Sequence, residues 1–174
     1  MEESLRGKLL IAAPSLFDFF RRTVILMVEH TEEGAFGVVL NRTSETTVAE
    51  AVPGLADLVG EGEMVRIGGP VATESVVVLG EFSDAEASPK IVVGNLGVVD
   101  PADEAEVVRA RVYAGHSGWG AGQLESEMER DAWLVEAASP EDPFLDDDLW
   151  PAVLQRRGGG YSLLATMPED PSLN

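Results

Sequence analysis

The stretch Tyr113-Ala-Gly-His-Ser-Gly-Trp-Gly-Ala-Gly-Gln-Leu-Glu-Ser-Glu-Met-Glu-Arg-Asp-Ala-Trp133 holds the most distinctive residues of this chain. Four glycines, at positions 115, 118, 120 and 122, surround His116, Ser117 and Trp119. Glycine adopts left-handed and closely packed backbone conformations that residues with a Cβ resist. We therefore predict a strand that leads into a glycine-rich turn, followed by a helix that starts near Gln123.

Apolar and β-branched runs predict strands over much of the remaining chain. The predicted strands cover residues 8–13, 23–30, 35–42, 64–67, 75–79, 91–93, 111–114 and 132–136. Residues 31–34 supply a short turn in which Gly34 can take a positive φ. Residues 23–42 are accordingly predicted to form a hairpin, followed by a turn at Gly68-Gly-Pro70.

Helices are predicted in three places from capping residues and charge placement. Residues 47–58 have Thr47 as a possible N-cap and are interrupted by Pro53-Gly54, while 101–110 and 149–157 end in basic residues. Residues 15–22 are expected to form a connector or helical turn. Strands in hairpins with few helices indicate a mainly antiparallel α+β fold rather than a doubly wound sheet.

The length of 174 residues predicts one compact domain over residues 1–174, with flanking helices around its sheets. Within it, residues 158–174 are expected to contribute a glycine-rich loop, a possible edge strand at 161–166 and a frayed tail.

The charge is strongly acidic, with 12 basic against 31 acidic residues and a formal net charge of −19. Such a surface repels nucleic-acid phosphates and anionic membranes, so direct binding to either is disfavoured. The chain has no cysteine, which removes thiol catalysis, disulfides and thiolate zinc sites. The short apolar run after Lys8 is broken by Pro14 and fits neither a signal peptide nor a membrane span, so we expect a cytoplasmic protein.

Ser117 beside His116 raises the possibility of a serine hydrolase. The nucleophile elbow needs the pattern G-x-S-x-G, and Trp119 stands where its last glycine would be. Neighbouring side chains also point apart, so His30 would have to serve as the base. A structural or ligand-binding role for this segment is the stronger hypothesis, and no catalytic residue is assigned.

Metal and phosphate sites are weaker alternatives. His30 and His116 have carboxylates near them in sequence but lack the spacing of metal ligands. Gly120-Ala-Gly-Gln123 could offer free backbone N–H groups to a phosphate, but acids and no lysine or arginine follow it. We predict no cofactor and no metal.

Glycine-rich turns next to exposed polar groups carry function more often than core strands do. We therefore predict a ligand-binding pocket between the turn at 68–70 and residues 115–123, with polar groups from the hairpin ends. The predicted site residues are His30, Asn41, Arg42, Gly68, Gly69, Pro70, His116, Ser117, Gly118, Trp119 and Gln123.

Several ordered blocks of this sequence resemble the YqgE/AlgH family of bacterial proteins. The blocks are Leu5–Leu16 with Asp18, Arg22–His30, Gly34–Arg42, Gly68–Val71, Gly115–Glu125 through Trp133, and Phe144 with Leu149-Trp150. They cover residues 5–157. One departure is His116-Ser117, where the family more often has Tyr-Ala, which weakens any catalytic role for either residue.

The resemblance implies a compact α+β fold with strongly bent sheets and no agreed enzymatic activity. Some family members carry a transcriptional-regulator label that comes from genetic effects and not from a DNA-binding motif. We expect a non-enzymatic regulatory or binding domain that acts through a protein or small-molecule partner. Direct transcriptional regulation and a hydrolase that uses Ser117 with a histidine are the alternatives.

Overall fold

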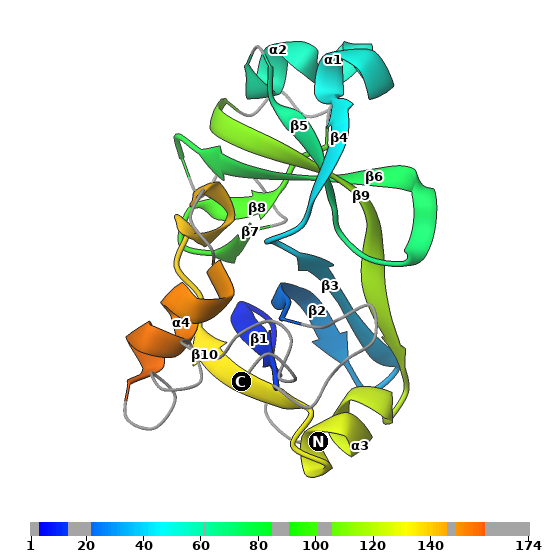
Figure 1. Ribbon diagram of the computed structural model, residues 1–174, viewed down its shortest axis with the longest axis vertical. Coiled ribbons are helices and arrows are strands. Elements are labelled where there is room, and N and C mark those ends of the chain that lie inside the picture. The colour runs from blue at the N-terminus through cyan, green and yellow to red at the C-terminus, as the bar shows by residue number, and fades with distance from the viewer. Residues whose placement is uncertain are drawn as a thin grey trace, which may run out of the picture.

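A bent sheet of ten strands forms the body of the protein in a computed structural model that describes residues 4–13, 22–60, 62–84, 91–100, 106–145 and 149–158 (Figure 1). The strands are β1 (Lys8–Ala12), β2 (Val24–Thr31), β3 (Gly34–Val39), β4 (Thr43–Thr47), β5 (Met64–Ile67), β6 (Val71–Phe82), β7 (Ile91–Val93), β8 (Leu96–Val98), β9 (Val107–Gly120) and β10 (Trp133–Ala137). Their order is β10-β1-β2-β3-β9-β6-β8-β7, and β5 pairs with both β4 and β9. The pairing of β5 with β9 is parallel and the other described pairings are antiparallel. The prediction of an α+β fold with mainly antiparallel sheets is confirmed.

The helices are short and lie at the margins of the sheet (Figure 1). They are α1 (Val48–Ala51), α2 (Ala56–Val59), α3 (Gln123–Glu129) and α4 (Leu149–Arg157), with 3-10 turns at Pro53–Leu55 and Asp142–Phe144. Thr47 caps α1 by accepting a hydrogen bond from Glu50 N–H at 3.2 Å, as its position in the sequence predicts. None of the described helices is long and apolar enough to cross a membrane.

Alternation along β1 and β2 gives the lower part of the sheet two apolar faces. Odd-numbered residues of β1 pack with Trp150 and Leu154 of α4, while Leu10 and Ala12 pack with Leu124 of α3 and the two tryptophans Trp119 and Trp133. The Trp150 Nε1–H donates to the Ala12 carbonyl at 2.9 Å and fastens α4 to β1.

The glycine-rich segment is part of the longest strand and not a turn. β9 continues through Gly115, Gly118 and Gly120, and the turn comes only at Ala121-Gly122, before α3. One end of β9 pairs with β3 over Ser117–Gly120 and the rest pairs with β6. β9 therefore joins the two halves of the molecule (Figure 1), and the predicted turn at 115–120 is wrong.

The predicted helix at 101–110 is also wrong where it can be compared. Val107–Ala110 belong to β9, and Arg109 pairs with Glu81 of β6. β4 and β8 are strands that the sequence patterns did not predict. Three segments with predicted structure lie outside the described residues: 101–105, 14–21 with all of the predicted connector at 15–22 except Arg22, and the 158–174 segment beyond Gly158.

The chain crosses β9 from one edge to the other at Gly68-Gly-Pro70. β5 and β6 both pair with Tyr113 and Ala114, so they lie on opposite edges of β9. The crossing backbone passes so close to β9 that a Cβ at Gly69 would lie 2.1 Å from the His116 carbonyl oxygen. A Cβ at Gly68 would lie 2.5 Å from the Gly115 oxygen. Glycine is required at both positions for steric reasons.

We predict that Gly69→Ala lowers the free energy of unfolding by about 3 kcal/mol or more, since the new methyl group meets backbone atoms that cannot move aside. Gly120→Ala is the matched control: it lies in the same glycine-rich region, but a Cβ there meets nothing within 4 Å. The control should stay within about 1 kcal/mol of the parent protein in urea unfolding. Equal stabilities of the two variants would contradict the close crossing.

Candidate functional site

The structure distributes the predicted site residues over several separate places. Asn41 and Arg42 follow β3, Gly68-Gly-Pro70 form the crossing, and His116–Trp119 belong to β9. His30 lies near the end of β2, and Gln123 begins α3. The hydrogen bonds and burial of these residues distinguish the side chains that stabilise the fold from those that lie next to open space.

Asn41 fixes the end of the β2–β3 hairpin. Its Oδ1 accepts a hydrogen bond from Val24 N–H at 3.0 Å, and its Nδ2 donates to the Arg22 carbonyl at 2.9 Å. The neighbouring Arg42 accepts Ile67 N–H at its carbonyl and so joins the hairpin to β5. The amide of Asn41 is thus occupied by the backbone.

Ser117 holds the crossing in place. Its side chain is completely buried, and its Oγ donates to the Gly68 carbonyl at 3.2 Å. The Gly68 carbonyl also accepts Val39 N–H at 2.9 Å. A hydroxyl that is buried and directed at a structural carbonyl is not positioned to attack a substrate, which argues against the hydrolase alternative.

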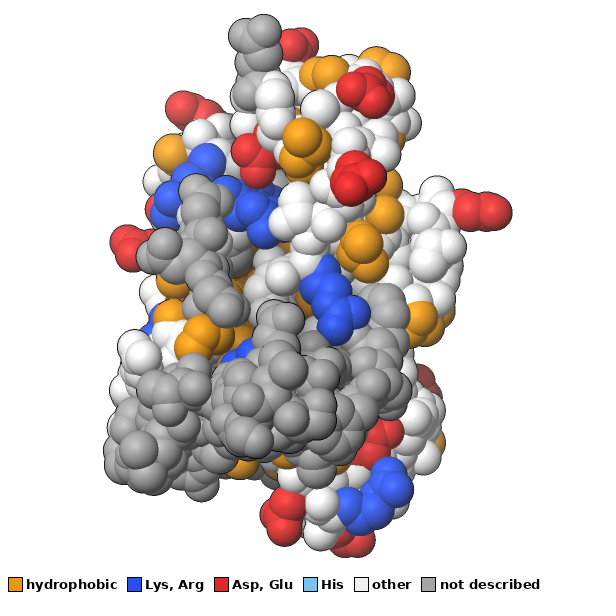
Figure 2. Space-filling view, in the orientation of Figure 1, with side chains coloured by type: hydrophobic (Ala, Val, Ile, Leu, Met, Phe, Trp, Pro, Cys, Tyr) orange, Lys and Arg blue, Asp and Glu red, His pale blue; other side chains and the backbone are white. Residues whose placement is uncertain are grey.

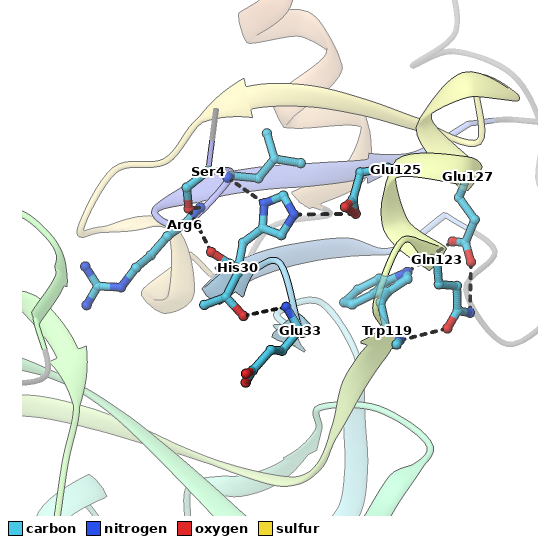
Figure 3. A network of polar contacts seen from close by, with 11 residues as sticks. Ser4, Arg6, His30, Glu33, Trp119, Gln123, Glu125 and Glu127 are labelled. Atoms are coloured by element: carbon cyan, nitrogen blue, oxygen red, sulfur yellow. Dashed lines mark hydrogen bonds and ion pairs between the residues drawn. The ribbon is translucent and has the colours of Figure 1, made fainter. Parts of the chain in front are cut away.

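His30 anchors the first described residues to β2 (Figure 3). Its Nδ1 accepts Leu5 N–H at 2.9 Å, so the neutral ring carries its proton on Nε2. The Nε2 is buried and forms no hydrogen bond among the described residues, and Glu125 Oε1 lies 3.6 Å away. The Ser4 hydroxyl donates to the His30 carbonyl, which completes the attachment.

Glu127 of α3 accepts hydrogen bonds from both tryptophans that flank this helix in sequence. Its Oε1 accepts the Nε1–H of Trp119 at 3.1 Å and that of Trp133 at 2.9 Å. Its Oε2 accepts a hydrogen bond from Gln123 Nε2, and Gln123 Oε1 in turn accepts Gly120 N–H at 3.0 Å. The right-hand side of Figure 3 shows this group. Trp119 and Gln123 therefore fasten α3 to β9.

His116 and Gly118 lie on the opposite face of β9 from Trp119. Residues paired across a sheet share a face, and Gly118 pairs with Phe36, which pairs with Glu29. The imidazole of His116 meets the Phe36 ring edge to face, with centroids 4.8 Å apart. Partial burial lowers the pKa of His116, so its ring is uncharged at pH 7.

A hollow of about 300 Å³ opens at the tip of the β2–β3 hairpin, next to this face. It is lined by Glu29, Thr31, Glu33, Gly34, Ala35, Phe36 and Trp119. Its wall combines two carboxylates with the ring of Phe36. At neighbouring Gly118, a Cβ would meet the side chains of His116 and Val71 at 3.9 Å, an ordinary contact distance, so this position has room for a small side chain.

The hollow includes one of the predicted site residues, Trp119, and borders His116 and Gly118. Glu29, Glu33 and Phe36 were not predicted as site residues, because a hairpin tip rich in acids is typical of an ordinary solvated turn. Glu127 was not predicted either, although its spacing of four residues from Gln123 places both on one side of a helix. Across the described residues, no three His, Asp or Glu side chains are arranged to hold a metal ion.

Comparison with known proteins identifies the relatives of this chain. The family model described as AlgH-like matches residues 9–162. A UPF0301 protein of Mycobacteroides abscessus is 45% identical over 97% of this chain and 87% of its own length. A UPF0301 protein of Streptomyces coelicolor is 43% identical over 98% of this chain and 96% of its own length. The resemblance read from the sequence blocks is confirmed.

Two solved structures share the fold. A Corynebacterium diphtheriae protein, DIP2367, superposes with a TM-score of 0.86 at 33% identity, over 95% of this chain and 93% of that one. The AlgH protein of Pseudomonas aeruginosa superposes with a TM-score of 0.73 at 30% identity, over 97% and 96%. The names of these relatives describe no reaction and no ligand.

We predict that Glu127→Ala destabilises the protein by about 2–4 kcal/mol, because it removes the acceptor of the indole N–H groups of two buried tryptophans. Glu129→Ala is the matched control, since Glu129 is an exposed glutamate on the same helix and should change stability by less than about 0.5 kcal/mol. Urea unfolding followed by tryptophan fluorescence measures both. Equal losses in the two variants would refute the role of Glu127.

Proposed function

The chain belongs to the AlgH-like family, and from that premise we propose that it is a non-enzymatic binding domain whose ligand site is the hollow at the β2–β3 hairpin tip. The proposal rests on the residues that line this hollow, where Glu29 and Glu33 lie close to the ring of Phe36. Carboxylates with an aromatic face suit a cationic group, which gains from ion pairing and from the ring quadrupole.

The ligand class that fits is an ammonium or guanidinium group, on a small amine or on a basic side chain of a partner protein. His116 is uncharged at pH 7 and does not repel such a ligand. The net charge of −19 favours the approach of cations over that of nucleic acids or anionic membranes. We place this activity in the cytoplasm, in keeping with the absence of cysteine.

In this proposal, the protein regulates by binding a basic partner and not by binding DNA. The two helices nearest to a helix–turn–helix arrangement, α1 and α2, have four residues each. A recognition helix must be long enough to place several side chains against base edges in the major groove. Regulation through a protein or small-molecule partner is therefore the form that we propose.

We predict that Glu33→Gln weakens the binding of a cationic probe about threefold, the usual size of one partly exposed ion pair. The probes are spermidine and an amidated Gly-Arg-Gly peptide, titrated at constant ionic strength and followed by amide NMR signals. The signals of Gly34, Phe36 and Gly118 should shift in the parent protein.

Glu32→Gln is the matched control, because it removes the same charge from the adjacent position of the same turn without touching the hollow. It should bind the probes like the parent protein. If both variants lose the same affinity, the probe responds to overall charge and the proposed site is wrong. Shifts confined to other parts of the sheet would lead to the same conclusion.

A further inference from the structure

Tyr113 carries a polar group that the fold leaves unpartnered. The residue lies in the middle of β9 and is completely buried, with its ring in the same core cluster as the residues of α4. Its hydroxyl has no hydrogen-bond partner in the part of the chain that the structure describes. Buried hydroxyl groups are nearly always paired in folded proteins, so this one indicates an acceptor that the described residues do not supply.

Two arginines share the face of Tyr113. Arg66 pairs with Tyr113 across β5 and β9, and Arg111 lies two residues earlier on β9, so all three side chains leave the sheet on the same side. Burial raises the pKa of Tyr113 well above its usual range, although both guanidinium groups act to lower it. The hydroxyl therefore remains a proton donor at any physiological pH.

Both guanidinium groups are held in position by the protein. Arg66 Nη1 donates to the Leu40 carbonyl at 3.4 Å. Arg111 Nη1 donates to the Pro143 carbonyl at 3.2 Å, and its Nε lies 3.2 Å from Glu63 Oε1. Arg111 is buried, whereas Arg66 and Glu63 are half-buried and partly reach solvent.

A cluster of arginines is unusual in a chain with this excess of acidic residues. Figure 2 shows basic side chains gathered on the upper left of this face, although the chain carries a net charge of −19. On β9, Arg109 stacks on the ring of Phe144 with its Cζ 4.1 Å from the centroid, and Arg111 reaches the same ring at 5.9 Å. Arginine pairs with carboxylate and phosphate groups through a planar fork of N–H donors, so its presence here suits an oxyanion.

We propose that Tyr113, Arg66 and Arg111 form a binding site for a small oxyanion, either a carboxylate or a phosphate group. The phenol donates one hydrogen bond to an anion oxygen, and the guanidinium groups supply charge and further N–H donors, of which each has five. None of these residues lines the hollow at the hairpin tip, so the site is independent of the proposed cation-binding function.

The test compares the parent protein with Tyr113→Phe, which removes the hydroxyl and keeps the ring. The melting temperature is measured with sodium phosphate, sodium acetate or sodium chloride at matched ionic strength, since a ligand that binds the folded state raises it. Phosphate or acetate should raise the melting temperature of the parent beyond the effect of chloride. Whichever of the two acts identifies the oxyanion class.

Without phosphate or acetate, Tyr113→Phe should melt at or above the temperature of the parent, because an unpartnered hydroxyl has been removed. Its affinity for the effective anion should fall about tenfold, the loss expected for one hydrogen bond to a charged group. Arg66→Gln should lose the response as well. Arg109→Gln, which removes an exposed arginine from the same strand, should keep it.

Three results would overturn the proposal. The first is a parent protein that responds to phosphate and acetate no more than to chloride. The second is that the variants Tyr113→Phe and Arg66→Gln respond as the parent does. The third is a Tyr113→Phe variant that melts clearly below the parent without any anion, since the hydroxyl would then have an internal partner.

Discussion

The close passage of Gly68-Gly-Pro70 over β9 is the constraint on which the rest of this fold depends. The chain must move from one edge of β9 to the other between β5 and β6, and it does so in contact with the backbone of Gly115–Ser117. The Ser117 hydroxyl and Val39 N–H both bind the Gly68 carbonyl, so the crossing is tied to β9 and to β3 at once. Because β9 pairs with strands from both halves of the sheet, this contact determines how the halves are joined.

Much of the fold could be predicted from the sequence, because it depends on local patterns. Apolar runs marked β1, β2 and β3, and Thr47 marked the start of α1 by its own side chain. The glycine-rich segment was misread because glycine density has two causes, turn formation and close backbone contact. Only the position of residues 68–70, which are distant in sequence, shows that Gly115 serves the second.

The remaining errors have similar non-local causes. Val107–Ala110 follow residues of helix-favouring type, but pairing with β6 makes Val107–Ala110 a strand, and tertiary pairing overrides local propensity. The candidate site was predicted from polar residues beside glycines, and many of these proved to be bonded to the backbone, as Asn41 and Ser117 are. The hollow could not be predicted, because Glu29, Phe36 and Gly118 become neighbours only through the register of three strands.

The proposed function also depends on β9. If β9 is a rigid central strand, His116 and Gly118 hold fixed positions beside the hollow and Ser117 is a structural residue. If residues 113–120 formed a mobile loop, a catalytic role for Ser117 would regain support. Native-state hydrogen exchange of the backbone amides from Val112 to Trp119 separates these two cases most directly. We predict that these amides exchange slowly and together, with protection close to that of the amides in β2. Fast exchange of His116, Ser117 and Gly118 at the rates of unstructured peptides would contradict the account.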